Sequence, residues 1–365
     1  MKPRERIKAI FNHQSHDRIP IQDRVWETTD LRWKEEGLPR DSSPQEFFGY
    51  EITRIWVDTT PQLPQKILSR DKTYTVRTTS YGQTIKHQTG VPNPYQTLEH
   101  PIKTKDDWKR IRSRLEAKED RLIRFESKLN QWLDWDRALE HYRNWQTSGN
   151  YIAYCDQVGF GLLHRYLGVE GTLIAMAEDP AWVKEMALFH ADLLISMYEI
   201  MVRKGFAFDA IYLSNDMGSQ RGLLFSPQFY RDQLFPADRL LYEYFSERGM
   251  PLILHSDGNI EGLIPLLIEA GFACLEPLEV KANMDFRRLH EQYADRIVLM
   301  GGIDVRLMAD ELEPGVIEEE IRTKFAVAKK YGRYIYHSDH SVPDNVSFAR
   351  YKHIIDLIKK YGSYD

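Results

Sequence analysis

The chain has 365 residues, of which 42% are hydrophobic, and it carries a formal net charge of −5. This length provides for one large domain or two ordinary ones, each with a substantial buried core. Acidic and basic residues are interspersed and no polybasic block occurs, so nucleic acid and anionic membranes are excluded as expected partners and a small-molecule substrate is favoured.

Two further features bear on the compartment. Cys155 and Cys274 lie inside apolar, strand-like runs, which favours a reducing compartment over a disulfide framework or a thiolate zinc site. The charged amphipathic start lacks the apolar core of a signal peptide, and no stretch reaches the ~20 apolar residues of a membrane span. We therefore expect a cytoplasmic protein, with a homodimer left open as its assembly.

The first helix is followed by two short strands whose ends are polar. The first strand is predicted at 19–23 and ends in Asp23 and Arg24, with Trp26 close behind. The second, ITRIWVD, ends at Asp58. Apolar runs that carry straight into polar residues are typical of buried parallel strands that deliver side chains to one edge of a sheet.

The next segment has a different period. Residues 66–88 alternate Thr, Val and Tyr around Asp71-Lys72 and Tyr81-Gly82, which is typical of antiparallel hairpin strands. We predict a hairpin insertion that covers one end of the main body. Residues 106–145 are rich in Lys, Arg, Glu and Leu at helical spacing, which predicts one or two helices with a solvated face.

From residue 150 onward strands and helices alternate regularly. With the two earlier strands this gives about eight strands, each followed by a helix, which fits a closed (β/α)8 barrel or an open doubly wound sheet. No GxGxxG follows the first strand, so the dinucleotide-binding form of the open sheet is disfavoured. We predict an α/β fold over 1–365: a single (β/α)8 TIM barrel with a β-hairpin insertion and additional helices near the N-terminal third. The later strands are expected in 150–159, 209–216, 251–258, 274–279, 297–304 and 334–339.

Ionisable residues stand at the ends of nearly all these strands, where barrels of this class carry their active sites. Any single one is equally well explained as a helix cap or a salt-bridge partner. Together, so many acids would repel one another unless a metal ion, neighbouring Arg and His side chains, or raised pKa values offset their charge. The residues are Asp23, Arg24, Asp58, Asp156, Asp216, His255, Asp257, Glu276, Glu279, Asp304, Asp339 and His340.

The stretch PLILHSDG is the most informative of these strand ends. His255 and Asp257 are two residues apart, so on a strand they project to the same face, where they could converge on one metal ion or one substrate group. The alternative is a hydrogen-bonded pair that caps the next helix.

Five segments, in this order and spacing, resemble the uroporphyrinogen decarboxylase superfamily, which includes the cobamide-linked methyltransferases. The likeness covers essentially the whole chain and implies a (β/α)8 barrel. The segments are RERIKAIFNHQSHDRIPI, NDMGSQRGLLFSPQFYRDQLFP, LHSDGNIEGLIPLLIEAGFACLEPLE, LMGGID and HSDHSVPDNVSFARY.

The decarboxylase branch implies a substrate held by arginines in the first of these segments. Arg24 matches the first arginine of the branch, whereas the second arginine and the glycine are absent, and Asp58 stands where an aspartate that steers the substrate is expected. Because Arg24 is the only permanent positive charge that we place at the rim, among many acids, we expect no appreciable turnover of uroporphyrinogen.

The methyltransferase branch implies a zinc site built from a His-x-Cys pair and a distant Cys. Here His255 and Asp257 replace the pair, and Asp339 stands at the second thiolate position. Such an N/O site still takes zinc but shifts its preference towards manganese, iron or cobalt. The resemblance also implies Glu276 as a fourth ligand, and His340 as the counterpart of a decarboxylase histidine or as a partner of the metal ligands.

We therefore expect metal-assisted methyl (one-carbon) transfer linked to a corrinoid on a partner protein. The alternatives are cofactor-free decarboxylation of a carboxylated pyrrole or aromatic acid, and a non-catalytic tetrapyrrole- or corrinoid-binding protein. The residue roles expected are a divalent metal ion (Zn, or Mn, Fe or Co) on His255, Asp257, Glu276 and Asp339; catalysis by Asp58, Asp216 and His340; and substrate binding by Arg24, Trp26, Asp156, Glu279 and Asp304.

Overall fold

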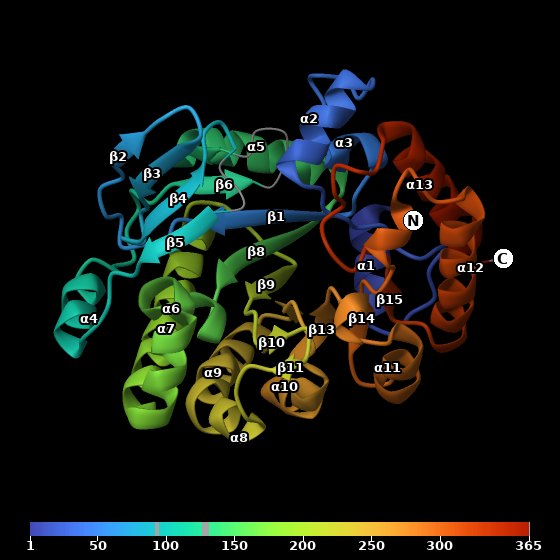
Figure 1. The fold of residues 1–365 in the computed structure, drawn as a ribbon. Coiled ribbons are helices and arrows are strands. Elements are labelled where there is room, and N and C mark those ends of the chain that lie inside the picture. Colours follow the sequence, from blue (N-terminus) through green and yellow to red (C-terminus); the bar gives the residue numbers. More distant parts are fainter. Residues whose placement is uncertain (92–94, 126–130, 365) are drawn as a thin grey trace.

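The computed structural model describes residues 1–91, 95–125 and 131–364, and its centre is a curled nine-stranded sheet surrounded by helices (Figure 1). The strand order is β15-β14-β13-β12-β9-β8-β1-β6-β7, and all neighbours from β15 to β1 run parallel. The bounds are β1 (Ile52–Val57), β6 (Ile123–Phe125), β7 (Trp132–Leu133), β8 (Tyr151–Gln157), β9 (Ala210–Ser214), β12 (Leu252–His255), β13 (Phe272–Glu276), β14 (Val298–Met300) and β15 (Tyr334–Ile335).

Helices connect successive parallel strands, as the predicted alternation requires. Ser226 and Ser347 cap α8 and α13 by accepting hydrogen bonds from the backbone N–H three residues on, the usual role of serine at a helix start. The helices are α1 (Pro3–Phe11), α2 (Glu27–Glu35), α3 (Pro44–Phe48), α4 (Lys105–Arg112), α5 (Trp135–Ser148), α6 (Gly159–Glu178), α7 (Pro180–Arg203), α8 (Pro227–Phe229), the π-helix η1 (Tyr230–Leu234), α9 (Phe235–Ser246), η2 (Glu261–Leu263), α10 (Ile264–Ala270), η3 (Val280–Ala282), α11 (Phe286–Tyr293), η4 (Val305–Met308), α12 (Pro314–Tyr331) and α13 (Phe348–Gly362).

Two hydrophobic cores alternate along the strands. On β12, Ile253 belongs to a small cluster inside the curled sheet, whereas Leu252 and Leu254 belong to the large cluster between the sheet and the helices. Ile7 and Ile10 of α1 join the inner cluster. This alternation follows from the two-residue period of a strand, and it makes the strands apolar on both faces, as parallel sheets require.

The regular sheet does not close into a complete barrel. The predicted first strand, 19–23, is not a regular strand; it lies between β15 and β1 and makes an isolated parallel bridge through Ile21 to Tyr336. Gln22 N–H donates to the carbonyl of Tyr336 at 3.0 Å, and Glu51 N–H donates to that of Ile21 at 2.9 Å. The fold is therefore of the TIM-barrel type, with one irregular segment in the place of a regular barrel strand.

The insertion forms a sheet of its own. Its four antiparallel strands are β2 (Ile67–Arg70), β3 (Tyr74–Thr78), β4 (Thr84–Gln88) and β5 (Tyr95–Glu99), in the order β2-β3-β4-β5, and they lie beyond one end of the central sheet (Figure 1). The predicted hairpin is thus present but continues past residue 88. A separate two-stranded sheet, β10 (Gly218–Ser219) with β11 (Gly222–Leu223), is a small hairpin after β9.

Of the one or two helices predicted over 106–145, two are present: α4 and α5 lie at the two ends of this stretch. The strands between them were not predicted: β6 and β7 add antiparallel strands to the edge of the central sheet at β1. Residues 126–130 of that stretch lie outside the described residues. Local helical composition is overridden here because β1 offers an unpaired backbone edge.

Among the residues that the structure describes, no helix combines the length and apolar character needed to cross a membrane.

Candidate functional site

A layer of polar side chains stands on top of the inner core at the carboxyl ends of the strands. Each member lies two residues after an inward-facing apolar residue: Ile52, Ala210, Ile253, Cys274 and Ile335 belong to the inner cluster. The two-residue strand period therefore points the next inward positions at the same space. These positions are Arg54, Tyr212, His255, Glu276 and His337.

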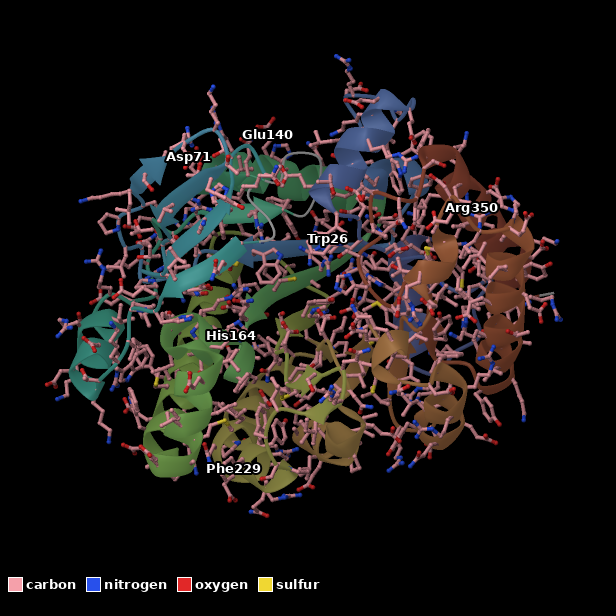
Figure 2. All side chains as sticks on the ribbon, viewed as in Figure 1. Trp26, Asp71, Glu140, His164, Phe229 and Arg350 are labelled. Carbon is pink, nitrogen blue, oxygen red and sulfur yellow. The ribbon has the colours of Figure 1, made fainter. Side chains whose placement is uncertain are left out.

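A cavity of about 460 Å³ opens above this layer. Its lining combines strand-end residues with the loop after the first irregular strand, the start of α2 and the loop between β4 and β5. Trp26, labelled in Figure 2, is 40% exposed, and its ring lies 5.7 Å from that of His340. Polar lining residues include Gln22, Asp23, Arg24, Arg54, Arg124, His255, Asp257, Glu276, His337 and His340.

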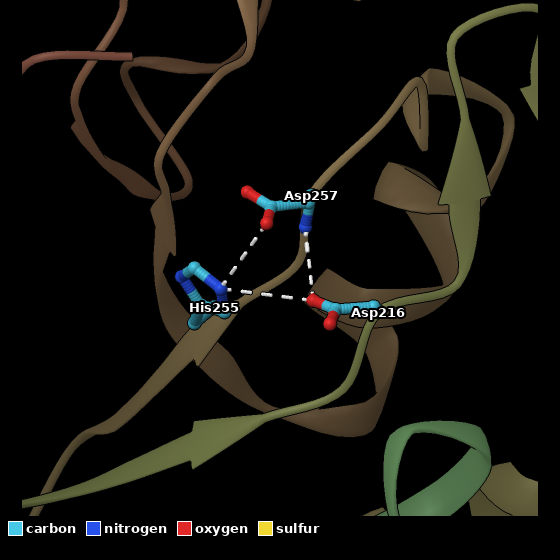
Figure 3. Close-up of side chains that lie close together, drawn as sticks. All are labelled: Asp216, His255 and Asp257. Carbon is cyan, nitrogen blue, oxygen red and sulfur yellow. Dashed lines mark hydrogen bonds and ion pairs between the residues drawn. The ribbon is translucent and has the colours of Figure 1, made fainter. Parts of the chain in front are cut away.

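Asp216, His255 and Asp257 converge on one another (Figure 3), and the last two of them line the cavity. His255 Nε2 lies 3.6 Å from Asp216 Oδ1 and 3.8 Å from Asp257 Oδ2. The backbone N–H of Asp257 donates to Asp216 Oδ1 at 3.2 Å, which ties the two loops together. One ligand atom from each of the three residues lies within 4.8 Å of the other two.

Glu276 holds the opposite side of the His255 ring. Its Oε2 lies 2.5 Å from His255 Nδ1 and accepts a hydrogen bond from the Tyr212 hydroxyl, also at 2.5 Å. With Nδ1–H donating to Glu276, Nε2 of His255 is left to face Asp216 and Asp257. This is how histidine ligands are oriented in metal sites, where a carboxylate holds the second ring nitrogen.

Electrostatics at the site follow from these contacts. Burial by itself would lower the pKa of His255, but Glu276, Asp257 and Asp216 outweigh burial and raise this pKa to about 10. The pKa of Asp257 is raised, first by burial and then by the neighbouring charge of Asp216. The pKa of Glu276 is lowered despite its burial, because His255 and His337 stabilise its charged form.

The donor set of this group fits a divalent cation. One imidazole nitrogen and two carboxylates are the N/O ligands that zinc, manganese, iron and cobalt accept. In addition, Oδ1 of Asp257 is buried without a hydrogen-bond partner among the described residues. A buried carboxylate oxygen without a donor is costly unless a cation or water satisfies it.

Glycine is required at the turn that carries Asp257. Gly258 has φ +82°, and a Cβ atom there would overlap the backbone of Gly218 in the β10–β11 hairpin. The Gly258 N–H donates to Glu279 Oε2 at 2.6 Å. The loops after β9, β12 and β13 are thereby packed against one another, which fixes how Asp216 and Asp257 approach His255.

The sequence profile of the family described as uroporphyrinogen decarboxylase (URO-D) matches residues 162–361. The chain belongs to the uroporphyrinogen decarboxylase family. The match covers β9, β12 and the later strands, and with them Asp216, His255, Asp257, Glu276 and His337.

The fold itself is shared with a solved structure. A methyltransferase from Methanosarcina mazei superposes with a TM-score of 0.65 at 14% sequence identity, covering 99% of this chain and 99% of that one. At this identity the likeness shows a shared fold. A family 5 xyloglucanase from Paenibacillus pabuli matches less well, with a TM-score of 0.37, 11% identity and 62% and 79% of the two chains covered. No protein of curated function is significantly similar in sequence.

Within this uroporphyrinogen decarboxylase-family barrel, two of the four predicted metal ligands, His255 and Asp257, lie in the cluster. Asp216, predicted to act in catalysis, takes the third position. Glu276 contacts the far nitrogen of His255 instead of facing the cluster. Asp339 is not part of the cluster: its carboxylate accepts backbone hydrogen bonds from Val280 and Val305, both at 2.8 Å.

Four other predicted site residues hold loops and do not line the cavity. Asp58 accepts from the Thr60 N–H at 3.0 Å and shapes the turn after β1. Asp156 accepts from the Thr59 hydroxyl at 3.0 Å. Glu279 accepts from Gly258, as above, and Asp304 is ion-paired with Arg306 at 2.7 Å. Carboxylate side chains at strand ends are within reach of backbone N–H groups, so most of them accept hydrogen bonds from the adjoining loops.

Arg24 and Trp26, predicted to bind substrate, and His340, predicted to act in catalysis, line the cavity together with residues that sequence reasoning missed. Arg54 on β1 and Arg124 on β6 also line it, so the premise that Arg24 alone supplies permanent positive charge is wrong. A signal for Arg54 was present, since it is the one charged residue in the buried run ITRIWV. No comparable signal marks Arg124, because β6 was not predicted.

Proposed function

We propose that the protein catalyses metal-assisted transfer of a methyl or related one-carbon group, linked to a corrinoid carried by a partner protein. The observation that carries the proposal is the convergence of Asp216, His255 and Asp257 at 3.6 to 3.8 Å beside a cavity at the carboxyl ends of the strands. Family membership supports an enzyme, because barrels of this class place their active sites at that end.

Each residue of the site has a defined task under this proposal. His255 Nε2 and the carboxylates of Asp216 and Asp257 would hold a divalent cation, and Glu276 keeps His255 in the required orientation. Such a cation supplies Lewis-acid chemistry, in that it polarises a heteroatom of the substrate. His340 lies at the cavity near Trp26, where its imidazole is placed to accept or donate a proton to bound substrate.

A second candidate, cofactor-free decarboxylation, is favoured by a separate observation. Arg24, Arg54 and Arg124 all line the cavity, and guanidinium groups are the usual partners of carboxylates. Three cations in one cavity remove the electrostatic argument against a substrate with several carboxylates. Turnover of uroporphyrinogen therefore has to be decided by assay.

The decisive experiment is metal analysis combined with a methyl-transfer assay. Purified protein, and apoprotein reconstituted in turn with Zn, Mn, Fe and Co, is expected to retain about one ion per chain. Asp257→Asn and His255→Gln are expected to lose it, whereas Asp304→Asn, a carboxylate paired with Arg306 outside the cavity, keeps it. The reconstituted protein should then speed the demethylation of methylcobalamin by a thiol such as 2-mercaptoethanol, followed by visible absorption.

The other candidate functions give different results in the same preparation. Absence of any retained metal, together with anaerobic formation of coproporphyrinogen from uroporphyrinogen, would replace methyl transfer by decarboxylation. A tightly bound chromophore without turnover of either substrate would indicate a tetrapyrrole- or corrinoid-binding protein.

A further inference from the structure

One buried carboxylate, that of Glu276, contacts two histidines. Glu276 is 2% exposed and lies at the end of β13, between β12 and β14. Its Oε2 serves His255 Nδ1 and the Tyr212 hydroxyl, each at 2.5 Å. Its Oε1 faces His337 Nε2 at 3.5 Å. Each oxygen of the Glu276 carboxylate therefore faces a histidine, His255 on one side and His337 on the other.

His337 is held rigidly enough to define one of those directions. Its side chain is 3% exposed, and Nδ1 lies 2.6 Å from the carbonyl oxygen of Ser338. A carbonyl oxygen only accepts, so Nδ1 carries a hydrogen. Nε2 faces Glu276 Oε1 and donates to it when the ring carries its second hydrogen, as an imidazolium paired with the carboxylate. Nε2 is buried and makes no hydrogen bond to any described residue. At 3.5 Å its contact with Glu276 Oε1 is an ion-pair distance, while Asp23 Oδ1 lies 3.7 Å from Nδ1 on the other side of the ring.

The segment that carries His337 is itself anchored by Asp23. The buried Asp23 carboxylate accepts from the Ser338 hydroxyl at 2.5 Å, the Tyr336 hydroxyl at 2.9 Å and the Tyr351 hydroxyl at 2.6 Å. These contacts join the irregular first strand and α13 to the strand end after β15. The position of His337 is thus determined by contacts with the irregular first strand, with α13 and with the strand end after β15.

We propose that His337 is a positioning residue for the metal ligand His255, acting through Glu276. By holding Oε1, His337 fixes the plane of the Glu276 carboxylate, so that Oε2 stays in line with His255 Nδ1–H. The His255 ring is then kept with Nε2 towards Asp216 and Asp257. The metal part of this inference rests on the proposed function; the hydrogen-bond geometry does not.

The test uses two amide substitutions, each of which replaces one of the two ring nitrogens of His337. In His337→Gln the amide nitrogen reaches the place of Nε2 and can still donate to Glu276. In His337→Asn the amide reaches only the place of Nδ1, so the contact with Ser338 is kept and that with Glu276 is lost. A residue that served packing alone would be affected about equally by both changes. His190→Asn is the matched control, since His190 is another buried histidine beside a carboxylate, 3.4 Å from Asp156.

The first readout needs no metal. In metal-free protein labelled with ¹⁵N-histidine, the short Nδ1–H···Oε2 bond of His255 should give a downfield proton resonance, assigned by its loss in His255→Gln. We expect it to persist in His337→Gln and His190→Asn. In His337→Asn we expect it to broaden or to exchange with water at least several-fold faster.

The second readout is the affinity for Co²⁺, titrated by its visible absorption. We expect His337→Asn to bind roughly tenfold more weakly than wild type, in the range found for lost second-sphere partners, and His337→Gln to bind within about twofold of wild type. Thermal unfolding of each variant shows whether it is folded, and Tyr212→Phe, which removes a donor to the same carboxylate, replaces His337→Asn if that variant does not fold.

The outcomes separate this inference from the proposed function. An unchanged His255 resonance in His337→Asn overturns the positioning role, whatever the metal data show. If wild type binds no Co²⁺ while the resonance is lost in His337→Asn and kept in His337→Gln, the metal proposal fails and the positioning role stands. Equal loss of the resonance in both variants also overturns it.

Discussion

His255 is surrounded by three carboxylates, and this decides how the site responds to pH. Glu276 contacts Nδ1, while Asp216 and Asp257 face Nε2. Together they raise the pKa of His255 from 6.5 to about 10, against the effect of burial. In the metal-free protein the His255 imidazole is therefore protonated at neutral pH, and a divalent ion that binds Nε2 has to displace the proton from that nitrogen.

From this charge state we predict that metal affinity rises with pH. The protonated form of His255 is stabilised in the folded protein, and that stabilisation is fully present below pH 6.5 and lost as pH rises through about 10. Because the metal competes with this proton, apparent affinity should increase by up to roughly tenfold per pH unit between pH 6.5 and 8.5. Calorimetric titration with Co²⁺ in buffers of different ionisation enthalpy should show about one proton released per ion.

Glu276→Gln provides the control for that experiment. Removing the first of the carboxylates that raise the His255 pKa should bring this pKa back towards its ordinary value. The pH dependence of metal binding should then flatten above neutral pH. An affinity that does not change with pH in the wild type would show that His255 is not a ligand.

At the scale of elements, the site depends on how closely the β10–β11 hairpin packs on the turn after β12. Gly258 adopts φ +82° against the backbone of Gly218, and the N–H of Asn259 donates to the Ser219 carbonyl at 2.9 Å. The hairpin follows Asp216 and the turn follows Asp257, so this contact sets the distance between the two carboxylates.

We predict that Gly258→Ala weakens metal binding as well as the fold. A methyl group there must push the hairpin away, which moves Asp216 relative to His255. The matched control is Gly249→Ala, because Gly249 also has a positive φ, +68°, but has nothing within 4 Å of its Cβ position. The control should show only the conformational cost, about 1–2 kcal/mol in unfolding free energy. Co²⁺ titration and urea unfolding of both variants measure these effects. Equal metal affinity in the two variants would contradict the prediction.

At the scale of the whole molecule, closure of the barrel depends on charge as well as on strand pairing. Glu51 is fully buried before β1, where Oε1 accepts from the Ile21 N–H at 2.8 Å and Oε2 accepts from Arg6 at 2.6 Å. Arg18 lies 2.8 Å from Oε1. One carboxylate thereby joins α1, the irregular first strand and β1 at the place where the regular sheet is interrupted.

We predict that Glu51→Gln destabilises the protein by roughly 3 kcal/mol, because Arg18 loses its charged partner and the buried Arg6 is left with Asp17 as its counter-charge. The comparison is Glu36→Gln, which breaks the Arg32–Glu36 pair between side chains that are each 32% exposed. Exposed pairs of this kind contribute about 0–1 kcal/mol. Unfolding in urea, followed by circular dichroism, measures both, and similar costs for the two variants would contradict a role of Glu51 in closure.

The barrel class and two of the three cluster residues, His255 and Asp257, could be predicted from the sequence. Apolar runs of parallel-strand length between amphipathic helices allow few architectures, so PLILHSDG could be placed as a strand end with His255 and Asp257 at the active edge. The same two-residue period, counted from the inner core, also marks Arg54, Tyr212 and His337. These three were missed because core membership on each strand is known only once the strands are side by side.

Tertiary structure alone decided which carboxylates face His255. Asp216 and Asp339 both follow strands, and the direction of each loop beyond its strand end is set by packing against the next loop, which no local period encodes. The Asp339 carboxylate accepts hydrogen bonds from the N–H groups of Val280 and Val305 and does not face His255. Asp216 meets the N–H of Asp257 and the His255 ring instead. A carboxylate accepts hydrogen bonds from the donors that the fold brings within reach, and the identity of these donors is a property of the folded chain.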